Sequence, residues 1–332
     1  PEQTLIGYPA RDLLLRREVI EHNLAALAEL AAAATDVAVV VGYAEPSTRA
    51  FGRPLFNAAA LLHRGQVLAR WQKRLLPTYD VFDEVRYFEP GGPQPVVELG
   101  GLRLGVTICE DMWSREEMLG QPLYDCDPIQ DLAAAGAQVV LNIAASPYFL
   151  GKHDLRFGLM AEHARRHRVP LLFVNQVGGN DELIFDGSST VVDAGGRLVG
   201  QAAAFAEDLL LVELSNLPAT RRALQPEGPA SLHAALVLGL RDYLRKCGFR
   251  AALVGLSGGI DSAVVAVLAA EALGPQNVQG VAMPSRFSSD HSVTDARVLA
   301  ENLGIQYAQI EIEPMHAAFE RGCGRRFPRL AD

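Results

Sequence analysis

The stretch that decides the fold of the last third of this 332-residue chain is Gly255-Leu-Ser-Gly-Gly-Ile-Asp-Ser262. It overlaps the end of a short apolar run at residues 251–256 and leads into a helical pattern at residues 260–273. Two adjacent glycines, Gly258 and Gly259, permit a tight turn and let a ligand approach the backbone. Amide groups at the start of the next helix would then face an anion. The stretch therefore predicts a strand–loop–helix unit that binds phosphate.

The loop also carries side chains that suit a nucleotide. Ser257 and Ser262 can donate hydroxyl hydrogen bonds to phosphate oxygens, and Asp261 can hold magnesium because hard cations select oxygen ligands. The loop lacks the Gly-Lys-Ser/Thr of a Walker A motif and the spacing of G-x-G-x-x-G. On the loop alone, a plain strand-to-helix turn made of small residues stays open as the simpler alternative.

Outward from the loop, the pattern predicts a second domain at residues 231–332 and a first domain at residues 1–214. The linker between them, residues 215–230, is polar and contains three prolines. The elements expected in the second domain are strands at 251–256 and 278–283 and helices at 231–246, 260–273 and 289–303, with Ser231 as the cap of the first helix. This alternation predicts an incomplete Rossmann-like, doubly wound parallel sheet.

The first domain mixes apolar strands with helical patterns. The elements expected are strands at residues 37–43, 102–108, 138–143, 170–176 and 209–214, helices at 13–34 and 154–168, and a hairpin of residues 189–193 and 198–201. Basic residues close the second helix, where they suit the helix dipole. Together these runs predict one α/β domain.

Composition limits the classes of function. Hydrophobic residues make up 49% and charged residues 21% of the chain, as in soluble globular proteins, and no apolar run is long enough to span a bilayer. The net charge of −9, with both signs mixed, argues against a nucleic-acid binder. The cysteines lie far apart with no C-x-x-C pair, which disfavours a zinc site or a disulfide framework and predicts free thiols in a reducing cytosol. They are Cys109, Cys126, Cys247 and Cys323.

Three segments of the first domain carry residues suited to chemistry. An apolar strand ends at Cys109 and is followed by two carboxylates, so the thiol can be exposed and activated at a strand end. Lys73 precedes a loop marked by proline, and Glu2 lies in the opening segment Pro1-Glu-Gln-Thr-Leu-Ile-Gly-Tyr-Pro9. Taken singly, the cysteine is most simply a buried structural residue, the lysine a surface residue, and the glutamate carries no signal.

Together the three segments resemble the Glu-Lys-Cys triad of the nitrilase-like carbon–nitrogen hydrolases, and above all the glutaminase domain of the glutamine-dependent NAD synthetases. The resemblance implies an αββα sandwich in which Glu2 is the general base, Lys73 the electrostatic stabiliser and Cys109 the nucleophile. Glu84 resembles a second glutamate that orients these groups, whereas Glu45 matches a non-catalytic strand end. The glutamine contacts implied are Tyr79, Ser146 and Lys152.

The chemistry implied by the resemblance is the hydrolysis of an amide. Glu2 would take the proton of the Cys109 thiol, and the thiolate would attack the carboxamide of glutamine. Lys73 and the N–H of Glu110 would stabilise the oxyanion. Ammonia would leave, and water would cleave the thioester.

The phosphate loop resembles the pyrophosphate loop of the ATP pyrophosphatases, and its flanks at residues 238–249 and 283–289 are similar to those of NAD synthetases. The resemblance implies that ATP adenylates deamido-NAD with release of pyrophosphate, and that ammonia then displaces AMP to give NAD. It also implies a homo-oligomer, and the charge and composition given above predict no nucleic-acid or membrane partner. The residues expected at ATP are Gly255, Leu256, Ser257, Gly258, Gly259, Ile260, Asp261 and Ser262, with Asp261 at magnesium.

The resemblance also sets expectations for both ends of the chain. Family members have a strand, a helix and a second strand before the catalytic glutamate, on the order of 40 residues, whereas Pro1 alone precedes Glu2 here. Ser262 is followed by 70 of the 332 residues, and residues 321–329 resemble the family's C-terminal tail, as after an internal deletion. We therefore expect Glu2 to fray and the chain as written not to make NAD.

Two other interpretations stay open on the sequence. The chain could be a different ATP-pyrophosphatase amidotransferase, or a nitrilase-type amidase with a decayed partner domain, and product identification with several acyl acceptors separates these. It could also be a non-catalytic nucleotide-binding remnant that serves as an assembly surface. In that case glutamine would not label Cys109.

Overall fold

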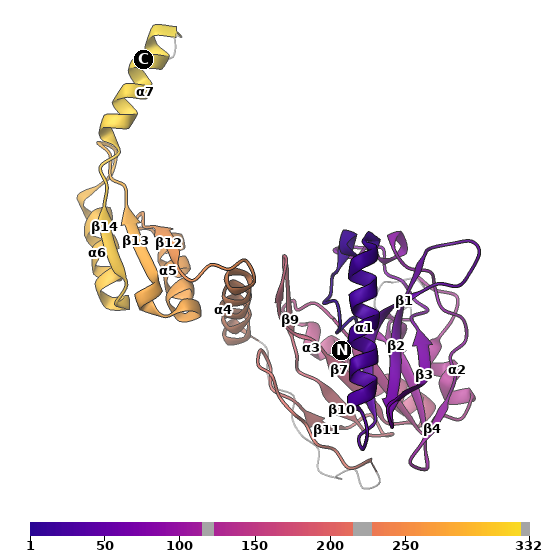
Figure 1. Cartoon of the computed structure of the whole chain (residues 1–332). Coiled ribbons are helices and arrows are strands. Elements are labelled where there is room, and N and C mark those ends of the chain that lie inside the picture. Colours follow the sequence, from indigo (N-terminus) through magenta and orange to yellow (C-terminus); the bar gives the residue numbers. More distant parts are fainter. Residues whose placement is uncertain (115–122, 215–227, 327–332) are drawn as a thin grey trace. The chain divides into compact units, whose positions relative to one another are not determined.

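Strand β2 (Leu55–His63) explains the layers of the first unit because it is buried along both faces. Successive side chains of a strand point to opposite faces. Ala58 packs in a cluster with helix α1 (Arg17–Ala33), whereas Ala59 and Leu61 join the core shared with the second sheet and its helices. The unit therefore has a helix, two face-to-face sheets and further helices (Figure 1), which is the predicted αββα sandwich.

The computed structural model describes residues 1–114, 123–214 and 228–326. The smaller sheet is antiparallel, in the order β1-β2-β3, with β1 at Val39–Pro46 and β3 at Gln66–Gln72. The larger sheet has the order β11-β10-β7-β6-β5-β4 and is parallel from β5 to β7. Its bounds are β4 (Val97–Leu99), β5 (Leu102–Ile108), β6 (Val139–Ala144), β7 (Leu171–Asn175), β10 (Thr190–Val192) and β11 (Leu198–Gln201).

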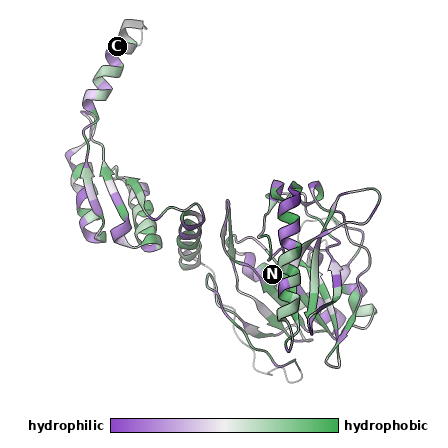
Figure 2. Ribbon diagram, in the orientation of Figure 1, coloured by the Kyte–Doolittle hydropathy of each residue, from purple (hydrophilic) through white to green (hydrophobic). Residues whose placement is uncertain are grey.

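The remaining elements of the first unit cover the sheets or connect them. Figure 2 shows hydrophilic and hydrophobic residues mixed along α1, as expected of a helix with one face on a sheet. The other elements are η1 (Arg11–Leu15), η2 (Glu84–Arg86), η3 (Cys109–Met112), α2 (Pro128–Ala134), α3 (Lys152–His167) and the hairpin β8 (Val177–Asn180) with β9 (Leu183–Asp186).

The chain divides into two compact units, Pro1–Ala235 and Leu236–Asp332. The second contains a parallel sheet in the order β12-β13-β14, which confirms the predicted parallel, Rossmann-like arrangement. Small side chains such as Ala266 and Ala296 let the crossover helices pack closely on this sheet. The bounds are α4 (Pro229–Lys246), β12 (Ala252–Gly255), α5 (Ile260–Leu273), η6 (Pro275–Asn277), β13 (Val278–Ala282), α6 (Asp290–Leu303), β14 (Gln306–Gln309) and α7 (Glu313–Arg326).

Two predicted details of the secondary structure are wrong. Residues 209–214 form no strand. Leu209 and Leu211 are 81% and 84% exposed, and the alternate residues Leu210, Val212 and Leu214 are only partly buried, so the run packs on its neighbours without joining a sheet. Ser231 is not a helix cap, because α4 already begins at Pro229, a residue suited to the first helical position. The domain limits themselves stay a prediction, since most of the linker at 215–230 and part of the 321–329 tail lie outside the described residues.

Among the described residues, none of the helices combines the length and apolar character needed to cross a membrane.

Candidate active site

The segment that carries Glu2 lies directly on strand β1 at Gly42. A Cβ atom at Gly42 would lie 2.4 Å from the carbonyl oxygen of Pro1 and 2.5 Å from the nitrogen of Gln3. The N–H of Leu5 donates to the carbonyl oxygen of Gly42 at 3.3 Å. Only glycine permits this approach, and it brings Glu2 to 0% exposure. The structure therefore holds Glu2 inside the unit and does not show the fraying expected from its place in the sequence.

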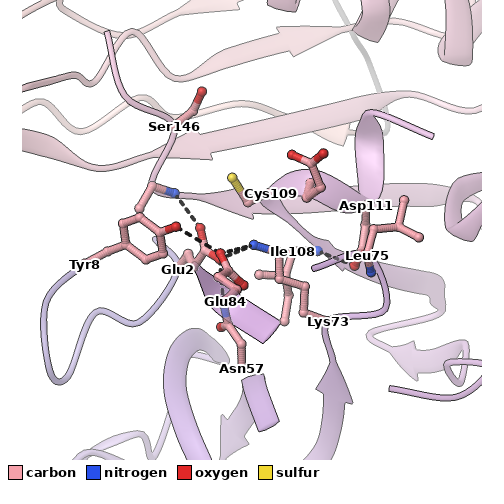
Figure 3. Close-up of polar contacts among 12 residues, drawn as sticks. Glu2, Tyr8, Asn57, Lys73, Leu75, Glu84, Ile108, Cys109, Asp111 and Ser146 are labelled. Carbon is pink, nitrogen blue, oxygen red and sulfur yellow. Dashed lines mark hydrogen bonds and ion pairs between the residues drawn. The ribbon is translucent and has the colours of Figure 1, made fainter. Parts of the chain in front are cut away.

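Lys73, which follows β3, joins two buried carboxylates. Its Nζ lies 2.7 Å from Oε1 of Glu2 and 2.7 Å from Oε1 of Glu84 (Figure 3). Asn57 of β2 donates to both carboxylates, at 2.6 Å to Glu2 and 3.3 Å to Glu84. The hydroxyl of Tyr8 donates to Glu84 at 2.9 Å. Each of these side chains is thus fixed by at least one neighbour, although the amide oxygen of Asn57 accepts no hydrogen bond from the described residues.

One ammonium between two carboxylates leaves the cluster short of positive charge. The pKa of Glu84 is raised from 4.5 to about 7, chiefly by burial; Lys73 opposes this rise and Glu2 adds to it. Burial alone would lower the pKa of Lys73, but Glu2 and Glu84 outweigh it, so the pKa of the ammonium is raised and it stays charged. The cluster can therefore hold or release a proton near neutral pH while its cation persists.

Cys109 directly follows β5, begins η3 and lies beside this cluster (Figure 3). Its φ of 45° is in the left-handed region, which costs a residue with a Cβ about 1–3 kcal/mol and is found mainly at functional sites. Burial raises the pKa of the thiol well above its usual range, Glu2 adds to this effect, and Lys73 opposes it. The resting thiol is therefore protonated and needs a neighbouring base to become a nucleophile.

Asp111 ties the turn at Cys109 to the chain after Lys73. Its Oδ2 accepts from the N–H of Ile108 at 2.9 Å, and its Oδ1 accepts from the N–H groups of Arg74 at 3.0 Å and Leu75 at 2.9 Å. The side chain is almost fully buried, and burial raises its pKa to about 6 despite the three donors. One carboxylate thus fixes the two backbone segments that carry the thiol and the ammonium.

Two further ionisable side chains, Glu110 and Lys152, lie near the thiol. The hydroxyl of Tyr79 donates to Glu110 at 2.9 Å and 3.0 Å, and that of Tyr124 donates at 2.8 Å. Lys152 begins α3, with its Nζ 4.7 Å from the ring centroid of Trp113. Burial raises the pKa of Glu110 and lowers that of Lys152. An acid and an amine therefore stand near Cys109 with few fixed partners of opposite charge.

Ser146 follows Ala145, whose backbone N–H contacts Glu2. The N–H of Ala145 donates to Oε2 of Glu2 at 3.1 Å, and that of Ser146 donates to Oδ1 of Asn175 at 2.9 Å. Asn175 in turn donates to Asp186 at 3.1 Å, and Asp186 forms a buried ion pair with Arg156. This network holds the loop with Ser146 against the cluster.

In the second unit, the phosphate loop has the geometry that its glycines predict. Gly258 has a φ of +79°, and a Cβ there would lie 2.4 Å from the carbonyl oxygen of Ser292, so only glycine fits. The hydroxyl of Ser262 accepts from the N–H of Ser257 at 3.2 Å and donates to the carbonyl oxygen of Gly259 at 3.0 Å. Helix α5 begins at once after the loop, and Asp261 in its first turn is exposed.

The structure thus brings Glu2, Lys73, Glu84 and Cys109 to one place, with Tyr79, Ser146 and Lys152 around them, from segments far apart in the chain. Glu45 lies apart in β1, where it accepts from Gln72 at 2.7 Å. Five further residues contact the site, and no role was predicted for them from the sequence. They are Tyr8, Asn57, Asp111, Tyr124 and Asn175. Asn57 alone gave a usable signal, because a single polar residue in an apolar strand usually has a buried partner.

Comparison with known proteins agrees with this geometry. The family model described as carbon–nitrogen hydrolase matches residues 1–222, and that described as NAD synthase matches residues 232–331. A glutamine-dependent NAD(+) synthetase of Synechocystis sp. is 46% identical over 97% of this chain and 59% of its own length. That of Aquifex aeolicus is 37% identical over 96% of this chain and 60% of its own length. The chain therefore spans about three fifths of the length of these relatives.

Solved structures show the same likeness. A glutamine-dependent NAD+ synthetase from Acinetobacter baumannii in complex with ADP has a TM-score of 0.88 and 35% identity, over 98% of this chain and 60% of that one. An amidase of the nitrilase superfamily from Nesterenkonia sp. AN1 carries an acetamide moiety covalently added at its active-site cysteine; it has a TM-score of 0.50 and 27% identity over 61% of this chain and 71% of its own. The first unit therefore has the nitrilase-like fold, residues 232–331 match NAD synthase, and the chain belongs to the carbon–nitrogen hydrolase family.

Proposed function

We propose that the first unit hydrolyses the side-chain amide of glutamine, and that the protein uses the ammonia with ATP to convert deamido-NAD to NAD. The observation that carries the proposal is the buried Lys73, 2.7 Å from both Glu2 and Glu84 and beside a strained Cys109. The relatives of 46% and 37% identity, named glutamine-dependent NAD(+) synthetases, support the choice of substrates.

In the proposed hydrolysis, Glu2 removes the proton of the Cys109 thiol, and the sulfur attacks the carboxamide carbon of glutamine. Oε1 of Glu2 already accepts from Lys73 and Asn57, so Oε2, with a single backbone donor, is the oxygen that receives the proton. Lys73 and the N–H of Glu110 stabilise the negative oxygen. The proton then passes to the departing ammonia, and a water molecule splits the thioester to give glutamate.

The charges around the thiol support an amino acid as the substrate. Free glutamine carries an ammonium and a carboxylate at its α-carbon. Glu110, oriented by Tyr79 and Tyr124, offers a buried acid for the ammonium, and Lys152 offers an amine for the carboxylate. Ser146 lies on the same loop as the backbone donor to Glu2. A simple amide without these charges would leave the buried Glu110 and the half-buried Lys152 without a partner of opposite charge.

For the second unit we propose that the Gly255–Ser262 loop holds the phosphates of ATP at the start of α5. A small cavity of 140 Å³ next to the loop is lined by Ser257, Met283 and Ser292, among others. Asp261 fits a magnesium ion that also binds phosphate oxygens, because magnesium in nucleotide sites takes one or two carboxylates from the protein. When bound, the ion supplies positive charge to the phosphates.

The hydrolysis is tested with glutamine labelled with ¹⁵N in its side-chain amide. Wild-type protein should release labelled ammonia, and Cys109→Ala should release none above the uncatalysed rate. Cys126→Ala is the matched control, since it removes a less buried thiol of the same unit. Labelled ammonia from Cys109→Ala at the wild-type rate would contradict the proposal.

Nucleotide use is tested separately. Isothermal titration with ATP and magnesium should show binding that Gly258→Ala abolishes and Cys109→Ala leaves unchanged. If ATP binding were insensitive to Gly258→Ala, the loop would not be the phosphate site. Incorporation of ¹⁵N from glutamine into NAD, measured by mass spectrometry with deamido-NAD present, tests whether the two reactions are coupled in this chain. The prediction that the chain as written does not make NAD requires that no labelled NAD forms.

A further inference from the structure

Three side chains of the kinds that bind metal ions lie next to η3, the turn that begins with Cys109, but outside the site described above. His163 and His167 are one turn apart on α3, and Asp127 immediately precedes α2. One ligand atom from each of the three residues lies within 4.8 Å of the other two. Two imidazole nitrogens and a carboxylate oxygen form a donor set that zinc uses in proteins.

The hydrogen bond of His163 determines which of its nitrogens can bind a metal. Its Nε2 lies 3.0 Å from the carbonyl oxygen of Met112, the last residue of η3. A carbonyl oxygen only accepts, so Nε2 carries the proton and the lone pair of the neutral ring is on Nδ1. Metal-binding histidines commonly donate their second N–H to a backbone carbonyl in this way. His163 is 1% exposed, so packing fixes the ring as well.

The other two residues are oriented but keep room to adjust. Oδ1 of Asp127 accepts from the N–H groups of Ile129 at 3.1 Å and Gln130 at 3.0 Å, which caps α2 and orients the second carboxylate oxygen. His167 is the last residue of α3, where the final carbonyl groups of the helix favour a cation. Its ring stacks on that of His163 at a centroid distance of 5.9 Å.

The charges near these three residues determine how tightly a metal ion should bind. The last turn of α3 also contains Arg165 and Arg166, which repel a metal cation. Arg166 lies 3.8 Å from Glu162, which offsets part of that charge. The balance favours reversible binding over a permanently occupied structural site.

We propose that Asp127, His163 and His167 bind a divalent metal ion of the zinc class. Bonds of about 2.0–2.1 Å to a tetrahedral ion would bring the ligand atoms to ~3.3 Å from one another, a movement that the half-buried Asp127 and His167 can supply. Because His163 also holds Met112, a bound ion would fasten η3 to α3. The cysteine spacing disfavoured zinc, but this site arises instead from the i,i+4 spacing in His163-Ala-Arg-Arg-His167.

Metal titration of the chelator-stripped 332-residue protein tests the proposal. With Co²⁺ as the probe, we expect one equivalent to bind with the visible absorption of cobalt bound by nitrogen and oxygen ligands. Zn²⁺ should then displace it and remove the absorption. Absence of any one-equivalent binding by the wild-type protein would overturn the site.

Two variants assign the binding to these residues. Asp127→Asn keeps a side chain that caps α2 while removing the charge, and His167→Ala removes a ligand that is only half buried. Each should weaken Zn²⁺ binding at least about tenfold, the loss usual even for an outer partner of a metal site. His22→Ala, an exposed histidine of α1, should bind as the wild type does. Circular dichroism confirms folding, and wild-type binding by both Asp127→Asn and His167→Ala would refute the assignment.

Discussion

The two candidate sites handle charge in opposite ways. In the first unit, Glu2, Lys73 and Glu84 are 0%, 1% and 4% exposed, and the ammonium of Lys73 pairs with both carboxylates. In the second unit, Asp261 and the Ser257 loop are exposed, and the loop's serine hydroxyls bond to its own chain. In the first unit burial raises the pKa values of Glu84 and Cys109, which suits a site that moves a proton. A phosphate ligand brings its own charge, so its loop can stay solvated until the ligand arrives.

The two sites should differ most in how much stability the protein loses when one charged side chain is replaced in each. Lys73→Met leaves two carboxylates buried without their cation, so the free energy of unfolding should fall by about 3–5 kcal/mol and glutamine hydrolysis should cease. Asp261→Asn should change stability by no more than about 0.5 kcal/mol. Urea unfolding of both variants measures the difference. Adding Glu84→Gln to Lys73→Met should recover part of the stability, and failure to do so would count against the charge argument.

A methyl group at the close backbone contact of each unit should affect that unit alone. Gly42→Ala pushes the segment with Glu2 off β1, and a shift of about 1 Å in a catalytic group can lower the rate about 100-fold. Gly258→Ala should leave hydrolysis intact and weaken ATP binding. Gly92→Ala, where a Cβ meets open space, is the control. Rates of ammonia release and titrations with ATP decide the outcome, and a Gly42→Ala enzyme of wild-type rate would show that Glu2 is placed by other contacts.

Asp111→Asn should separate positioning from simple stability. The amide can still accept from Arg74 and Leu75 but opposes a donor to the N–H of Ile108, so the turn at Cys109 shifts. We expect kcat to fall about tenfold with little change in KM, because the nucleophile moves relative to Lys73. Asp193→Asn is the matched control, since Asp193 also accepts backbone N–H groups, from Gly195 and Arg197, but far from the thiol in sequence. Equal kcat values for the two variants would contradict the proposal that Asp111 positions Cys109.

The smallest effect concerns pH. Burial raises the pKa of Glu84 from 4.5 to about 7, so its contribution to stability is complete below about pH 4.5 and is lost as the pH rises through about 7. Between about pH 4.5 and about pH 7 the wild type should lose up to about 1 kcal/mol per pH unit relative to Glu84→Gln. The plot of unfolding free energy against pH for Asp261→Asn should run parallel to that of the wild type. Urea unfolding across this range measures the slopes, and parallel curves for Glu84→Gln would contradict the raised pKa.

The sequence predicted those parts of the sites that are local in the chain. Cys109 at a strand end and the Gly258-Gly259 turn are consequences of neighbouring residues, and the structure shows both. The meeting of Glu2 with Lys73 and Glu84 depends on the pairing of β1, β2 and β3, which periodicity did not reveal, because β2 is apolar on both faces and does not alternate. Their convergence was anticipated only through the family resemblance.

Residues that act through other residues were not predicted. Asp111 looks like one of two acidic residues after a cysteine, and only the fold places it within reach of Arg74 and Leu75. Tyr124 gave no signal, since a tyrosine in a polar stretch is common. The strand at 209–214 was predicted but is absent. Its hydrophobic composition favoured a strand, but composition alone does not supply a neighbouring strand to pair with.

The backbone N–H of Ala145 carries a consequence for selectivity. It donates to Oε2 of Glu2, the oxygen proposed to receive the thiol proton, and the next residue, Ser146, is proposed to hold the ligand. One peptide group therefore stands between the occupant of the pocket and the proton acceptor. A substrate analogue that fits poorly at Ser146 would misalign that acceptor, so it would be bound but turned over slowly. Competition assays, which report binding, would then underestimate how well the enzyme distinguishes the analogue from its substrate.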